Sequence, residues 1–134
     1  MPSEMRLSRY FEHALRSQDQ VFQFWVAEDG HGSVIGWEML ISVSADPRNR
    51  LLTGEATTCL GRQSSSLGRT LVTHAIRHAA RTPLQYLFAR VPTRDTLMIG
   101  VLESVGYQEV GVIPPAGKAP ARPERIEFVY VVES

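Results

Sequence analysis

The longest regular pattern in the sequence is an amphipathic helix that follows a run of small polar residues. Its apolar side chains recur at steps of three and four and are Leu67, Leu71, Val72, Ala75, Ile76 and Ala79. The pattern continues to Arg81, where Thr82-Pro83 is a stop signal. Apolar residues have the same spacing in a second segment, which lies between Asp95 and Gly106. Asp95 is its expected N-cap, and Gly106 is its expected end. Both segments lie between short apolar runs, which favours helices packed on a sheet.

Branched and aromatic residues in these runs predict strands at 21–27, 34–43, 51–60, 84–91, 107–113 and 126–132. The turn residues between the first two runs indicate a hairpin. A further helix is expected from Leu7 to about Gln18, because apolar residues recur there at helical spacing. The expected order is α-β-β-β-α-β-α-β-β. This order is typical of an α/β (α+β) protein with a mixed, mostly antiparallel central sheet flanked by helices, and we expect one domain over residues 1–134.

The composition excludes several classes of protein. Acidic and basic residues cancel at 14 each, and the arginines are scattered, so nucleic acid is not an expected partner. The single Cys59 cannot form an intrachain disulfide, which fits a reducing compartment. No window approaches the about 20 apolar residues that a membrane span needs, and the start lacks the apolar core of a signal peptide. We therefore expect a cytoplasmic protein without a membrane partner.

Residues 61–68 join a predicted strand to the long helix and have the composition of an anion-binding loop. Ser64, Ser65 and Ser66 precede Leu67 and Gly68. The first amides of a helix lack partners inside the helix, so small side chains let a phosphate approach them. The alternative is a simple N-cap with a flexible loop, which three serines alone do not exclude.

This junction resembles the coenzyme A loop of the GNAT acetyltransferase superfamily, which reads Gln/Arg-x-x-Gly-x-Gly/Ala. Gln63 and Gly68 match that pattern, and Ser66 stands where the family has its first glycine. Residues 69–76 resemble the helix that follows in the family, and residues 105–111 resemble the start of its sixth strand. The nearest resemblance is to the phosphinothricin-type acetyltransferases, through the segments 24–28, 34–37 and 55–60. We expect this chain to lack the family's first strand and helix.

The resemblance implies an acetyl-coenzyme A-dependent N-acetyltransferase that acts on a small-molecule amine, such as an amino acid or an amino-acid-like toxin. It implies that the backbone N–H of Leu60 donates to the thioester oxygen. It also implies that Glu55 takes the ammonium proton, although an exposed strand carboxylate is an equal alternative. The expected coenzyme-binding residues are Leu60, Gln63, Ser64, Ser65, Ser66, Leu67, Gly68, Arg69, Thr70 and Asp95.

Two departures from the family leave alternatives open. Leu102 stands where many relatives have a side chain that protonates the leaving thiolate, and it cannot donate a proton. The expected lack of N-terminal elements leaves an open amine pocket or one completed by a second subunit, so a homodimer is a further expectation. The alternatives are a catalytically weak or silent GNAT-like module that binds acyl-coenzyme A, and a likeness of fold without any coenzyme.

The remaining candidate residues favour ordinary structural roles. His74 and His78 have the spacing of metal ligands but no third ligand, so we expect them on a solvated helix face and expect no metal. Cys59 has no activating histidine in the sequence and is expected to be an unreactive strand residue. Tyr107 is expected in the core.

Overall fold

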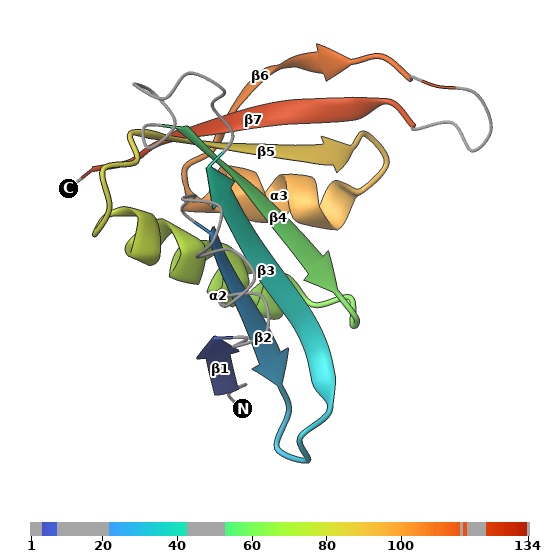
Figure 1. The fold of residues 1–134 in the computed structure, drawn as a ribbon. Coiled ribbons are helices and arrows are strands. Elements are labelled where there is room, and N and C mark those ends of the chain that lie inside the picture. The colour runs from blue at the N-terminus through green and yellow to red at the C-terminus, as the bar shows by residue number, and fades with distance from the viewer. Residues whose placement is uncertain (1–3, 8–21, 43–52, 116, 118–122, 134) are drawn as a thin grey trace.

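The computed structural model describes residues 4–7, 22–42, 53–115, 117 and 123–133. In these ranges the strands form one mixed sheet of seven strands in the order β1-β2-β3-β4-β5-β7-β6, and both helices cover the same face (Figure 1). The elements are β1 (Glu4–Leu7), β2 (Phe22–Glu28), β3 (Val34–Ser42), β4 (Thr53–Leu60), α2 (Ser65–Ala79), β5 (Tyr86–Pro92), α3 (Thr96–Val105), β6 (Gln108–Ile113) and β7 (Arg125–Val131). The predicted fold class is confirmed.

The first strand corrects one expectation. Residues Glu4–Leu7 pair antiparallel with β2 at the edge of the sheet, so the chain has a strand ahead of β2 that the sequence analysis did not predict. The sequence pattern missed it because a strand of four residues takes its stability from backbone pairing and has too few side chains for a visible period. The helix predicted from Leu7 onward starts at a residue that belongs to β1, and its other residues lie outside the described ranges.

The predicted hairpin and helix ends are confirmed. The strands β2 and β3 pair antiparallel from Phe22 with Ile41 to Glu28 with Val34. The helix α3 is capped by the Asp95 carboxylate, which accepts from Met98 N at 3.2 Å, and it ends at Gly106 with φ 111°. No helix in the described ranges is long and apolar enough to cross a membrane.

The core lies between the sheet and the two helices. Its fully buried members come from β3, α2, β5, α3 and β7, and they include Leu40, Leu71, Leu87, Leu102 and Phe128. Two glycines allow the close approach of α2. A Cβ at Gly36 would lie 3.1 Å from Leu71 Cδ1 of α2, and a Cβ at Gly68 would lie 3.2 Å from Val101 Cγ2 of α3. These contacts fix the start of α2 against the sheet and α3.

The strands β4 and β5 are the only parallel neighbours in the described sheet, and they pair over a short length. Their register joins Thr53 to Tyr86, Gly54 to Leu87 and Glu55 to Phe88. Beyond Glu55, β4 pairs only with β3, while β5 pairs with β7 along its whole length. The two strands therefore separate towards Leu60 and Pro92, as Figure 1 shows.

Candidate active site

A cleft occupies the space where β4 and β5 separate. One cavity of about 200 Å³ is lined from both strands and from α3, by residues that include Thr58, Arg90 and Leu102. A second cavity of about 230 Å³ is lined by Thr58, Cys59, Leu60, Gln63, Asp95 and Met98. Both cavities share Thr58, Asp95 and Met98, so they adjoin. We call these two cavities together the splay cleft.

The edge of β4 presents unpaired backbone groups to the splay cleft. Gly61 N donates to Ile35 O at 2.9 Å, so Gly61 directs its N–H towards β3. Backbone groups of successive residues in an antiparallel strand point to alternate sides. Cys59 therefore also faces β3, whereas Thr58 and Leu60 direct their N–H and C=O groups into the splay cleft. Among the described residues no strand pairs with this edge beyond Glu55, so an extended ligand can add to it as a strand would.

The start of α2 has the geometry of an anion site. Gly68 N donates to Ser64 O at 3.0 Å, and Leu67 N donates to the Ser64 hydroxyl at 3.2 Å. No oxygen of the described residues accepts from the amides of Ser65 and Ser66, and both residues are exposed. The first turn contains no acidic residue, so the positive end of the helix dipole is not neutralised there. These amides are available to a phosphate.

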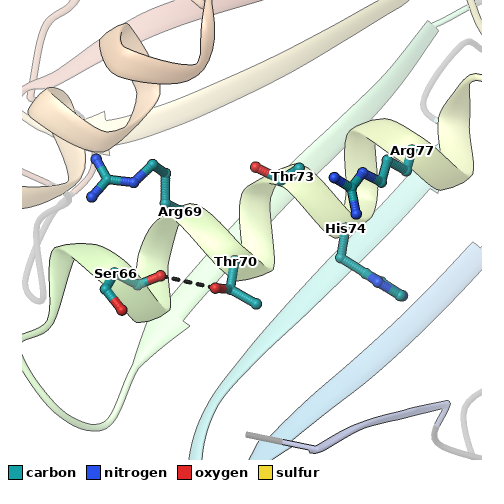
Figure 2. A pocket seen from close by; sticks show the side chains of 6 residues that line it. All are labelled: Ser66, Arg69, Thr70, Thr73, His74 and Arg77. Atoms are coloured by element: carbon teal, nitrogen blue, oxygen red, sulfur yellow. Dashed lines mark hydrogen bonds between the residues drawn. The ribbon is translucent and has the colours of Figure 1, made fainter. Parts of the chain in front are cut away.

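The other residues of the predicted coenzyme loop fall into two groups. Leu67 and Gly68 are buried, so only their backbone is accessible to a ligand. Arg69 and Thr70 are exposed, and with Ser66, Thr73, His74 and Arg77 they line a shallow pocket of about 420 Å³ along α2 (Figure 2). Thr70 Oγ1 donates to Ser66 O at 3.0 Å. Arg69 forms no ion pair with any described residue, and its charge lies one turn from the free amides.

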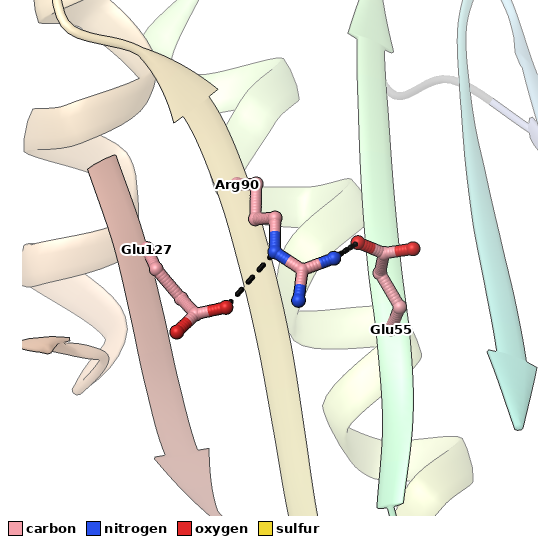
Figure 3. A network of polar contacts seen from close by, with 3 residues as sticks. All are labelled: Glu55, Arg90 and Glu127. Atoms are coloured by element: carbon pink, nitrogen blue, oxygen red, sulfur yellow. Dashed lines mark hydrogen bonds and ion pairs between the residues drawn. The ribbon is translucent and has the colours of Figure 1, made fainter. Parts of the chain in front are cut away.

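Glu55 lies at the last paired position of β4, where the splay cleft opens. Its side chain is on the face of the sheet away from the helices, and its Oε2 is 2.8 Å from a terminal nitrogen of Arg90. Arg90 Nε is 2.9 Å from Glu127 Oε2, so one guanidinium joins two carboxylates on three strands (Figure 3). Glu55 Oε1 has no hydrogen bond to a described residue. The sequence analysis did not identify Arg90, because the pairing of β5 with β7 cannot be read from local patterns.

A buried acid behind the wall of the splay cleft was also missed. Glu38 on β3 is 0% exposed, and it lies opposite Thr58 in the register of β3 and β4. Thr58 Oγ1 donates to Glu38 Oε1, while Glu38 Oε2 has no partner among the described residues. Burial raises the pKa of Glu38 well above its usual range, and the Thr58 hydrogen bond opposes this only in part. The alternation along β3 carried the signal, because Glu38 falls between Gly36 and Leu40 on the core side.

Leu102 and Tyr107 occupy the core beside the splay cleft. Leu102 is 2% exposed and lines the cleft with an apolar side chain. Tyr107 is buried, which confirms the prediction that it belongs to the core. Its hydroxyl has no hydrogen bond partner among the described residues, and burial, followed by the charge of Glu38, raises the pKa of the phenol.

The two histidines of α2 differ from the expectation. They were expected on a solvated face, but His74 and His78 are partly buried and meet the ring of Trp25 edge-on, with centroids 4.9 and 5.2 Å away. Burial, followed by the charge of Arg81, lowers the pKa of both. Apolar spacing along α2 did not identify this contact because Trp25 comes from a distant strand. The described residues contain no cluster of side chains that could hold a metal ion.

Comparison with known proteins gives matches by structure alone. No protein-family model matches the sequence, and no curated protein matches it. A GNAT superfamily phosphinothricin acetyltransferase from Sinorhizobium meliloti, solved in complex with acetyl-coenzyme A, has a TM-score of 0.77 at 15% identity and covers 98% of this chain and 89% of its own. Mutant forms of the spermidine/spermine N-acetyltransferase SpeG from Vibrio cholerae have a TM-score of 0.72 at 15% identity, covering 96% and 94%.

A third structure extends this group to a protein substrate. The ribosomal-protein-alanine N-acetyltransferase from Brucella melitensis has a TM-score of 0.74 at 20% identity and covers 92% of this chain and 75% of its own. At these identities the likeness is one of fold, and the fold is the same in all three. The chain therefore has the fold of the GNAT acetyltransferase superfamily, as the residues around Gln63 and Gly68 predicted.

Proposed function

We propose that this protein is an acetyl-coenzyme A-dependent N-acetyltransferase that acts on the amino group of a small molecule. One observation carries the proposal: the splay cleft is bordered by the unpaired edge of β4 and by Gln63, the loop residue that leads to the free amides at the start of α2. Acetyl-coenzyme A has an anionic pyrophosphate and an extended arm with amide groups. The anion site at the start of α2 suits the pyrophosphate, and the free edge of β4 suits the extended arm. The S. meliloti protein of the same fold was solved with this ligand.

The chain offers a place for each part of the coenzyme. The amides of Ser65 and Ser66 would bind the pyrophosphate, with Arg69 as a nearby positive charge, and the loop residue Gln63 leads from them into the splay cleft. Thr58 and Leu60 would pair with the amide groups of the arm. The N–H of Leu60 would then donate to the thioester oxygen, where negative charge develops during attack by the amine.

Glu55 is the proposed base for the attacking amine. The amine reacts only when it is neutral, so a proton acceptor must lie at the mouth of the splay cleft. Arg90 holds Oε2 of Glu55 and fixes the direction of the carboxylate, while Oε1 remains to accept a proton directly or through water. In this arrangement Arg90 positions the base and does not itself touch the reacting atoms.

The acceptor is proposed to be a small cationic amine. Glu55 and Glu127 together exceed the charge of the single Arg90 between them, so this trio carries a net negative charge that favours a cation beside it. An amino acid or an amino-acid-like toxin is the finer proposal, and it rests on the resemblance to phosphinothricin acetyltransferases. The lone Cys59 supports a cytoplasmic location as part of the same proposal.

A second candidate function is a module that binds acyl-coenzyme A with little or no turnover. It is favoured by Leu102, an apolar side chain on the wall of the splay cleft where a proton donor is expected. Release of free thiol from acetyl-coenzyme A, measured across a panel of small amines, separates the two functions. Amine-dependent release supports the enzyme, binding without release supports the module, and the absence of binding contradicts both.

A further inference from the structure

The steps proposed above leave one buried polar pair unused. Glu38 and Thr58 face each other across β3 and β4, and the Thr58 hydroxyl is hydrogen-bonded to Glu38 Oε1. Thr58 lines both cavities of the splay cleft, whereas Glu38 lies behind it and is 0% exposed. The hydroxyl of Thr58 is therefore the contact between the splay cleft and a carboxyl group that solvent does not reach.

The surroundings of Glu38 favour its protonated form. Its register neighbours are Trp25 on β2 and Thr58 on β4, and the phenol of Tyr107 is close enough for the charge of an ionised Glu38 to act on it. None of the three is a cation, and no described residue forms an ion pair with Glu38. An ionised carboxylate without a positive partner is costly in a protein interior. Burial accordingly raises the pKa of Glu38 well above its usual range, which favours the protonated carboxyl.

The departing group of the proposed reaction needs a proton on the same side of the sheet. Thr58 and Leu102 line one cavity, and Leu102 has no proton to give. A thiol has a pKa of about 8.5, so a buried carboxyl with a raised pKa is closer to a matched donor than an ordinary carboxyl would be.

We propose that the Glu38 carboxyl and the Thr58 hydroxyl form a proton route to the leaving thiol. This inference rests on the proposed acetyl transfer. The amine nitrogen forms the C–N bond, and the C–S bond breaks with its electron pair on sulfur. For this step the Thr58 hydroxyl turns from Glu38 Oε1 to sulfur and gives sulfur its proton, and the Glu38 carboxyl donates its own proton to the Thr58 oxygen. The proton that the amine loses passes through Glu55 to water, and after the products leave water in the splay cleft returns a proton to Glu38 through the Thr58 hydroxyl, so the protons balance.

Three variants test the route. Thr58→Val keeps the shape of the side chain and removes the hydroxyl, and Thr58→Ser keeps the hydroxyl. Glu38→Gln keeps a neutral side chain without a transferable acid proton. We expect Thr58→Val and Glu38→Gln to lower turnover by about 100-fold or more. Thr58→Ser should remain within a few-fold of the wild type. All three should bind acetyl-coenzyme A with wild-type affinity in calorimetry.

A measurement without any ligand checks the proton itself. Infrared difference spectra of the free protein against Glu38→Gln, at neutral pH, should contain the carbonyl band of one protonated carboxyl group. The band should move to that of a carboxylate only at distinctly alkaline pH. A spectrum in which Glu38 is already ionised at neutral pH would overturn the proton route whatever the kinetics show.

The outcomes separate this inference from the proposed function. If the wild type binds acetyl-coenzyme A but no amine of the panel causes release of thiol, the transferase proposal fails and the proton route fails with it. If the wild type turns over and Thr58→Val is equally fast, the proton route alone is wrong. Should Thr58→Val fail to fold, Glu38→Gln decides, because wild-type turnover in that variant also contradicts the route.

Discussion

At the scale of single residues, Glu55 and Glu127 form a matched pair. Both contact the guanidinium of Arg90, but Glu55 lies where β4 and β5 separate, whereas Glu127 lies on β7. We expect Glu55→Gln to lower kcat/KM by about 100-fold or more, because the amine loses its base. Glu127→Gln should remain within a few-fold of the wild type. Thiol release measured over a range of pH checks both variants.

Equal losses in the two variants would contradict the assignment of Glu55 as the base. They would mean that the carboxylates matter only by holding Arg90. A Glu55→Gln variant with undiminished turnover would remove Glu55 from the mechanism altogether.

Glu38 makes the stability of the fold depend on pH. Burial raises its pKa in the folded state, while the unfolded chain returns to about 4.5. Below that pH both states hold the proton, and above it only the unfolded state releases the proton. The contribution of Glu38 is therefore fully present below pH 4.5 and is lost as the pH rises towards the folded pKa. In urea denaturation at several pH values, the free energy of unfolding of Glu38→Gln should rise relative to that of the wild type as the pH rises.

Two curves that stay parallel over this range would show that Glu38 titrates normally in the folded protein. His74 and His78 act in the opposite direction, since their lowered pKa values cost stability as the pH falls below 6.5. Both proteins contain these histidines, so their effect cancels in the comparison.

Prediction from sequence was uneven at the residue scale. The alternation of β3 placed Glu38 on the core side, so its burial could have been predicted. The contact of Arg90 with Glu55 and Glu127 could not, since it joins residues on three strands whose order depends on long-range pairing. The roles proposed for the loop residues came from the resemblance. At Leu67 and Gly68, which are buried, only the backbone can have such a role.

At the scale of elements, the free edge of β4 gives a residue-specific test. Cys59 and Gly61 direct their amides to β3, whereas Thr58 and Leu60 direct theirs to the splay cleft. In hydrogen exchange followed by NMR, the Thr58 and Leu60 amides should exchange fast in the free protein and slowly with acetyl-coenzyme A bound. The Gly61 amide should be protected in both states. Fast exchange at Leu60 with the ligand bound would contradict pairing of the coenzyme arm with β4.

Two glycines test the packing of the helices. A Cβ at Gly100 in α3 meets nothing within 4 Å, so Gly100→Ala should raise the free energy of unfolding by about 0.5–1 kcal/mol. A Cβ at Gly36 would lie 2.9 Å from the backbone oxygen of Cys59 and 3.1 Å from Leu71 Cδ1 of α2, so Gly36→Ala should lower the free energy of unfolding by about 1–3 kcal/mol. Urea denaturation measures both. Similar effects of the two substitutions would contradict the close approach of α2 to the sheet.

Local patterns predicted the elements better than their arrangement. Helical spacing and caps were sufficient for α2 and α3, and turn residues were sufficient for the hairpin of β2 and β3. The short strand β1 was missed because it depends on its partner. The insertion of β7 between β5 and β6 is a long-range choice that local patterns do not reveal.

At the scale of the whole molecule, the sheet consists of two parts that meet at a short parallel contact. The strands β1 to β4 form one part, and β5, β7 and β6 form the other. The helices and the common core join the two parts beneath the splay cleft. The proposed function therefore follows from the arrangement of the whole sheet, since neither part alone would contain both the free strand edge and the far wall of the cleft.

The central claim is that the free amides at the start of α2 bind the phosphates of acetyl-coenzyme A. Ser65 is the first residue of α2, and Ser64 before it is extended at φ −141° and ψ 116°. Proline is favoured at a first helical position and accepts an extended residue before it, so Ser65→Pro removes one amide N–H without disturbing the helix. Ser65→Ala removes only the hydroxyl and is the matched control.

Calorimetric titration of acetyl-coenzyme A into these two variants and the wild type is the most direct measurement. We expect Ser65→Ala to bind as the wild type does. Ser65→Pro should bind roughly 10- to 100-fold more weakly, because it loses one hydrogen bond to a charged group. Equal affinities in all three proteins, or no binding to the wild type, would contradict the account.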